Sequence, residues 1–162
     1  MAFILYREST QSVLAMSEEN TFVESDGVRI IEQDLVIADH YSPALVLSSD
    51  GNSVENKFPG KTYEEQRELH DAEIRESNLA KTKSDKKIAI MSFATSRIDD
   101  LKWKIEKAKD LDLLSGTSTN SDAVYLEFKQ IKDAANSYYE NFVANATTLE
   151  EIAAVDSKGF LS

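Results

Sequence analysis

The pattern of apolar and polar positions changes character at Pro59-Gly60. Before this point, short runs of β-branched, aromatic and aliphatic residues alternate with polar turn residues, which is typical of short strands. After it, proline is absent and glycine occurs only at positions 116 and 159, which favours long helices. The pattern predicts an α+β fold, with a small antiparallel β-rich docking region at residues 1–60 and a helical region at residues 61–162.

Six short apolar runs in the first region predict strands: residues 3–6, 12–16, 22–24, 28–31, 35–38 and 44–47. Asp26-Gly27 separates two of them and supplies the positive φ values that a tight turn needs, so residues 21–25 and 28–31 are the best candidate hairpin. A second cluster of turn residues at 48–52 predicts another turn near the end of the β region.

The helical region has recognisable start signals. Thr62 followed by Glu65 forms a capping box, in which each side chain accepts a hydrogen bond from the other residue's backbone N–H. From residue 63 to 87 apolar positions are sparse and charges are dense and mixed. A long charged helix of this kind gains little from its own side-chain pairs, so we expect it to be stabilised by a partner.

Two stripes of apolar residues follow at alternating spacings of three and four. The first comprises Met91, Ala94, Ile98, Leu101, Ile105 and Ala108, and the second comprises Val124, Phe128, Ile131, Ala135, Tyr138 and Phe142. This spacing is typical of helices that pack knobs into holes. The polar stretch 115–118 lies between the stripes, and Thr119 with Asp122 predicts the next helix start.

These stripes predict an antiparallel, coiled-coil-like helical hairpin at residues 88–144. Residues 147–150 carry another capping signal, which predicts a short C-terminal helix. The sequence leaves open whether the stripes pair within one chain or between copies in a homo-oligomer. The candidate interaction residues on the helix seams are Met91, Ile98, Leu101, Ile105, Val124, Phe128, Ile131, Tyr138 and Phe142.

Charge bears on the choice of partner. The formal net charge is −11, and residues 1–60 carry only three Lys and Arg against ten Asp and Glu. A nucleic-acid backbone needs a basic surface, so we expect no nucleic-acid partner. The run Ala2 to Tyr6 is too short for a signal-peptide core and lacks a basic leader, and no apolar stretch approaches the roughly 20 residues that cross a bilayer. We therefore expect neither a signal peptide nor a membrane partner.

Residues that commonly carry catalysis are scarce. Cysteine is absent, and His40 and His70 are the only histidines, which we interpret as surface residues. Their spacing fits no zinc motif, Asp50-Gly51-Asn52 lacks the alternating ligands of a calcium loop, and the glycines fit no phosphate-binding motif. We therefore assign no catalytic residue, cofactor or metal and expect no enzyme. The lysines between 81 and 87 form one basic cluster, open to solvent or to an acidic surface.

The order of elements also carries a resemblance. A β-rich start, a charged helix and a helix–polar loop–helix ending near residues 149–156, whose sequence is LEEIAAVD, resembles bacteriophage tail-fibre assembly and tail accessory proteins. The chain lacks the tryptophan- and arginine-containing pattern common near their C-termini. The resemblance implies a chaperone or adaptor for tail or fibre components, located in the virion or the host cytoplasm, without catalytic residues.

The sequence thus predicts a non-enzymatic structural or interaction protein, which binds partner proteins through its β region and its helices. An alternative hypothesis is an acidic inhibitor or regulator of a host enzyme, attracted to its target by the charge of the first segment.

Overall fold

The computed structural model describes residues 1–161 and confirms the predicted α+β class. The chain divides into two compact units, residues 1–76 and residues 77–162. The division lies inside the long helix α1, Tyr63–Leu101, whose first turns therefore belong to the β-rich unit. Each unit is described below by itself.

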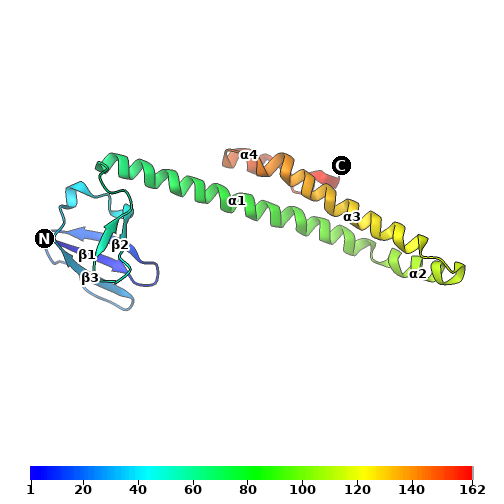
Figure 1. The fold of residues 1–162 in the computed structure, drawn as a ribbon, viewed down its shortest axis with the longest axis horizontal. Helices are drawn as coiled ribbons and strands as arrows, with labels where there is room; N and C mark the ends of the chain where they lie inside the picture. The colour runs from blue at the N-terminus through cyan, green and yellow to red at the C-terminus, as the bar shows by residue number, and fades with distance from the viewer. Residues whose placement is uncertain (162) are drawn as a thin grey trace. The chain divides into compact units, whose positions relative to one another are not determined.

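The first unit contains a five-stranded antiparallel sheet. Its strands are β1 (Ala2–Arg7), β2 (Ser12–Ser17), β3 (Val28–Gln33), β4 (Leu45–Leu47) and β5 (Val54–Asn56), in the spatial order β3-β1-β2-β4-β5. Of these strands, β1, β2 and β3 are labelled in Figure 1. Every second side chain of β1 is buried, as expected when one face of a strand covers a core. The core residues are Ala2, Ile4, Tyr6, Ile31, Leu45 and Val54.

Three predictions about the strands need correction. Residues 22–24 form no strand; around Asp26-Gly27 there is only an isolated bridge from Ser25 to Val28, and β3 pairs with β1 instead. Residues 35–38 overlap the 3-10 helix η1, Ile37–Asp39, and residue 44 belongs to η2, Ser42–Ala44. The strand β5 was not predicted. A short apolar run therefore does not by itself fix a strand, because strand formation depends on the partner that the fold supplies.

The predicted start of α1 is confirmed. Thr62 donates its backbone N–H to Glu65 Oε2 at 2.8 Å, and Glu65 N–H donates to Thr62 Oγ1 at 3.3 Å. The hydrogen bond from the Thr62 backbone also holds the pKa of Glu65 below its usual value. The capping box therefore fixes the first residue of the helix.

The second unit is an antiparallel helical hairpin (Figure 1). After α1 the chain forms α2 (Trp103–Ser115), α3 (Thr119–Tyr139), the π-helical turn η3 (Glu140–Ala144), α4 (Leu149–Ala154) and the 3-10 turn η4 (Gly159–Leu161). Two hydrogen bonds between the arms of the hairpin show that the arms run in opposite directions. Lys83 bonds to Ala144, and Lys104, farther along the first arm, bonds to Glu127, which comes earlier in the second arm. The core consists of Ile90, Ala94, Ala135, Val143, Ala146 and Ile152.

The two apolar stripes supply much of this hairpin interior. Ala94, Ile98, Leu101, Ala108 and Ala135 are buried. Met91, Ile105, Val124, Phe128, Ile131 and Tyr138 are half-buried. Members of both stripes, among them Met91, Ala94, Ile131, Ala135 and Tyr138, pack in one core within the second unit.

Phe142 departs from the expected pattern. It is 57% exposed, and its neighbour Val143 is buried in its place. The reason is the π-helical turn at Glu140–Ala144, which adds one residue to a turn and moves the inward position forward by one. The ring of Phe142 lies instead against that of Tyr138, with ring centroids 4.8 Å apart.

Candidate interaction surfaces

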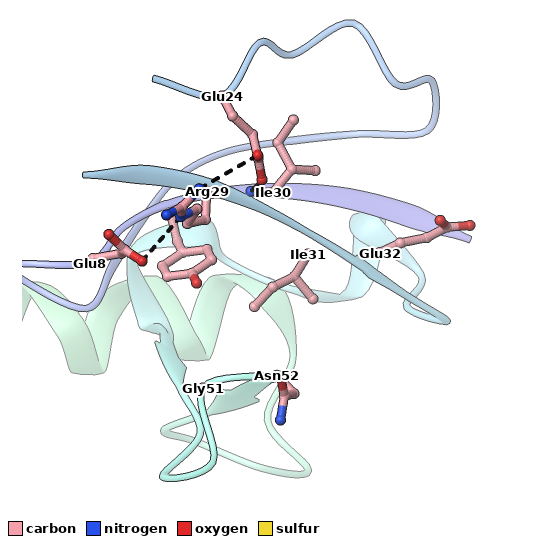
Figure 2. A pocket seen from close by; sticks show the side chains of 9 residues that line it. Glu8, Glu24, Arg29, Ile30, Ile31, Glu32, Gly51 and Asn52 are labelled. Atoms are coloured by element: carbon pink, nitrogen blue, oxygen red, sulfur yellow. Dashed lines mark hydrogen bonds and ion pairs between the residues drawn. The ribbon is translucent and has the colours of Figure 1, made fainter. Parts of the chain in front are cut away.

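An open pocket of about 340 Å³ lies beside β3 on the first unit (Figure 2). The carboxylates of Glu8 and Glu24 lie on either side of the Arg29 guanidinium. Arg29 Nε is 3.1 Å from Glu8 Oε1, and Arg29 Nη1 is 3.8 Å from Glu24 Oε2. The other lining residues are Tyr6, Ile30, Ile31, Glu32, Gly51 and Asn52.

The pocket carries net negative charge, because Glu8, Glu24 and Glu32 outnumber the single Arg29. The hydrogen bond to Glu8 raises the pKa of Arg29, and the negative charges of Glu8 and Glu24 act in the same direction. Ion pairs as exposed as these contribute little to stability. The pocket is suited to weak attraction of a cationic side chain rather than to enclosing a small substrate.

A buried glutamine connects the start of α1 to the loops of the sheet. Gln66 is only 1% exposed. Its amide nitrogen donates to the carbonyl oxygens of Asp39 and Lys61, each at 2.8 Å. Its amide oxygen accepts from Tyr41 N at 3.0 Å and from Asn56 Nδ2 at 2.8 Å. All four bonding positions of the amide are therefore used, which fixes these segments around one side chain.

Both histidines lie around this glutamine, and both are half-buried, which corrects their interpretation as surface residues. His40 Nδ1 is 2.9 Å from Asn56 Nδ2, and because an amide nitrogen only donates, Nδ1 is the acceptor of this hydrogen bond. The His70 ring contacts Tyr41 edge-on, with centroids 5.7 Å apart, and its buried Nδ1 has no hydrogen-bond partner among residues 1–161. Local spacing gave no sign of this grouping, because it depends on the fold.

The acidic side chains and histidines are spread over the described residues rather than gathered into a ligand set. Within residues 1–161 no group of three or more His, Asp and Glu side chains is placed to hold a metal ion. Asp50, considered as part of a calcium-like loop, accepts hydrogen bonds from Ser48 Oγ at 2.5 Å and from Asn52 N at 3.0 Å. Those bonds lower its pKa and account for its position as part of a polar turn.

The loop end of the hairpin is organised by Asp112, which is only 6% exposed. One carboxylate oxygen accepts from Asn120 N and Nδ2, and the other accepts from Ser121 N and Oγ. Burial alone would raise the pKa of Asp112, but these hydrogen bonds outweigh it and hold the pKa far below the usual carboxyl range. Asp112 on α2 thus satisfies the free N–H groups at the start of α3, in place of the predicted Thr119 and Asp122 arrangement.

The predicted basic cluster is partly used inside the second unit. Lys83 Nζ donates to the carbonyl oxygen of Ala144, and Lys86 Nζ donates to that of Val155, each at 2.7 Å. Lys87 Nζ lies 4.6 Å from the centroid of the Tyr139 ring. Cations near the C-terminal ends of helical segments satisfy carbonyl groups left without intrahelical partners. These lysines therefore hold the C-terminal segments against α1.

Large apolar side chains are exposed near the loop end of the hairpin. We call them the loop-end apolar group: Trp103, Leu111, Leu113, Leu114, Tyr125 and Leu126. Leu113 and Leu114 are 84% and 85% exposed. The sequence-based seams did not include any of them, since they lie off the period that the hairpin interior follows.

Comparisons with known proteins found no matching family model, no matching curated protein and no matching solved structure. Within residues 1–161, none of the helices combines the length and apolar character that a bilayer crossing requires.

Proposed function

We propose that the chain is a non-enzymatic adaptor that binds other proteins through the loop end of its helical hairpin. The loop-end apolar group carries the proposal, because six large apolar side chains near one end of a small unit are unusual on a surface that stays in water. Covering such surface stabilises a complex by about 25 cal/mol for each Å² of apolar area removed from water.

The composition of α2 supports the same proposal. Ile105 and Ala108 face the hairpin interior, whereas Trp103 and Leu114 point to the other side and are 59% and 85% exposed. A helix with apolar residues on both sides is ordinarily covered on both sides. In this unit α3 covers one side of α2, and a binding protein would cover the other.

The resemblance to tail-fibre assembly proteins makes tail or fibre components the first partners to test. In the adaptor we propose, the β-rich unit contributes a second, acidic surface. Residues 1–76 carry six basic and sixteen acidic residues, whereas residues 77–162 carry twelve and thirteen. Charge concentrated in one unit attracts basic surfaces over a distance and speeds association with them.

This uneven charge also favours the second candidate function, an acidic regulator that binds an enzyme through the first unit. The two candidates differ in which substitutions weaken binding. An adaptor loses its partner when the loop-end apolar group is changed, whereas a regulator loses it when Glu8, Glu24 and Glu32 are changed to Gln or when the ionic strength is raised.

The test uses the full-length, tagged chain, crosslinked in its native cells and recovered for quantitative mass spectrometry. Leu113→Ser combined with Leu126→Ser should lower recovery of a specific partner at least tenfold. Lys129→Ser combined with Asp133→Ser, two exposed polar positions on α3, is the matched control and should leave recovery unchanged. Equal recovery with the apolar variant and the wild type would contradict the adaptor proposal.

A further inference from the structure

Four residues form a straight stripe on the outer side of α2. They are Trp103, Lys107, Asp110 and Leu114, spaced by four, three and four residues. At 3.6 residues per turn, these positions fall within roughly 60° of one another around the helix axis. The buried Ala108 and Asp112 lie on the other side of the helix, so the outer stripe points away from α3.

The outer stripe is complementary to itself when its direction is reversed. Reversal exchanges Trp103 with Leu114 and Lys107 with Asp110, so each apolar residue meets an apolar one and each charge meets its opposite. We infer that a second copy of this chain binds here, with the two α2 helices antiparallel around a two-fold axis between residues 108 and 109. This inference rests on the proposed function: it takes part of the loop-end apolar group, Trp103 and Leu114, as a binding surface and identifies a second copy of the chain as the protein that binds there.

Every member of the outer stripe is available for this contact. Trp103 and Leu114 are largely exposed, and Lys107 and Asp110 are exposed. Neither charge forms an ion pair with any residue between 1 and 161. In the antiparallel pair Lys107 of each copy lies opposite Asp110 of the other, so symmetry gives two opposite-charge pairs. A parallel pair would place Lys107 opposite Lys107 and Asp110 opposite Asp110, which is unfavourable.

The charge balance of the second unit permits the contact. Residues 77–162 carry twelve basic and thirteen acidic residues, so this unit is nearly neutral although the whole chain is at −11. At physiological salt, charges farther apart than about 8 Å are largely screened. A contact limited to one 13-residue helix is short of a standard interface, so the dimer should be weak, with a dissociation constant in the micromolar range or above.

The first test is the mass of the full-length protein by sedimentation equilibrium from micromolar to millimolar concentration. Wild type should approach the dimer mass as concentration rises. Asp110→Lys or Lys107→Asp alone should raise the dissociation constant about tenfold, because each creates two like-charge pairs by symmetry. The double variant K107D/D110K restores both opposite-charge pairs and should return the dissociation constant to within about twofold of wild type.

Matched controls separate this contact from a general effect of charge. Lys129→Asp and Asp133→Lys make the same charge changes at exposed positions of α3 and should leave the dissociation constant unchanged. Leu114→Asp should abolish the dimer. All these positions are exposed, and circular dichroism with thermal unfolding should show that every variant is folded like wild type.

The second test uses the absence of native cysteine. Mixed samples of Trp103→Cys and Leu114→Cys should form a disulfide between the two variants. Neither variant alone should crosslink efficiently, because two copies of position 103 would lie about 16 Å apart along the helices. Preferential crosslinking of Trp103→Cys with itself would show a parallel pair and overturn the inference.

Three further results would overturn it: a monomer throughout the concentration range, a dimer that persists in Leu114→Asp, or a charge exchange that fails to restore association. If the chain is monomeric and a different protein protects the outer stripe, the occupant is that protein. The adaptor proposal stands or falls separately, because its test changes Leu113 and Leu126 and measures recovery of another protein.

Discussion

The side-chain amide of Gln33 pairs with the backbone of Val54 as a neighbouring strand would. Gln33 Oε1 accepts from Val54 N at 2.8 Å, and Gln33 Nε2 donates to Val54 O at 3.2 Å. Gln33 ends β3 and Val54 begins β5, which are the two edge strands of the sheet. One side chain therefore joins the two edges of the curled sheet where no backbone ladder connects them.

Gln33→Ala should loosen this junction. The change leaves both backbone groups of Val54 without their partner, and an unsatisfied buried group costs about 1–3 kcal/mol. We expect faster hydrogen exchange at the Val54 amide and a lower free energy of unfolding of the first unit. Gln33→Glu is the informative comparison, because it keeps the acceptor for Val54 N and loses the donor to Val54 O. Unchanged exchange in Gln33→Ala would show that the junction contributes nothing.

Gln66→Leu should destabilise the first unit more severely. The substitution preserves approximate volume but removes the partners of two carbonyl groups, one backbone N–H and the Asn56 amide. We expect the free energy of unfolding in urea to fall by at least about 2 kcal/mol, measured through the tyrosine fluorescence of Tyr41 and of Tyr63 at the start of α1. Arg67→Leu, at an exposed neighbouring position, is the control and should change stability by less than about 0.5 kcal/mol.

Asp112 should make the folding stability of the hairpin depend on pH. Because the folded-state pKa lies below the ordinary value of 3.8, the carboxylate stabilises the folded state above that value. This contribution falls as the pH drops through the folded-state pKa. Asp112→Asn should therefore unfold at a lower temperature than wild type at pH 7, with a difference that narrows as the sample is acidified below pH 4. A difference independent of pH would show that the charge is not responsible.

Two adjacent residues test the π-helical turn. Val143→Ala removes buried apolar volume and should cost about 2 kcal/mol, whereas Phe142→Ala, at a half-exposed ring, should cost less than about 1 kcal/mol. Chemical unfolding of both variants provides the measurement. The opposite order would place Phe142 in the core and restore the uninterrupted heptad that the sequence predicts.

The sequence by itself determined the features that depend on residues three or four positions apart. The capping boxes at Thr62 and Thr148 begin α1 and α4 where predicted, and most positions of the two stripes are buried or half-buried on their helices. In each capping box the interacting groups are close along the chain, and within each stripe a helix brings residues three and four apart onto one face. Local spacing is then enough to fix both the element and its buried side.

Only the tertiary structure decided the features that join distant residues. The pairing of β3 with β1, the bond of Gln66 to Asp39 and the meeting of Asp112 with Ser121 depend on how the chain folds back. Burial of a polar group is favourable only when all its partners arrive together, and residues 5 to 27 positions away supply them here. The spacing of residues along the chain does not indicate contacts between distant residues. The four partners of Gln66 and the capping role of Asp112 therefore could not be predicted.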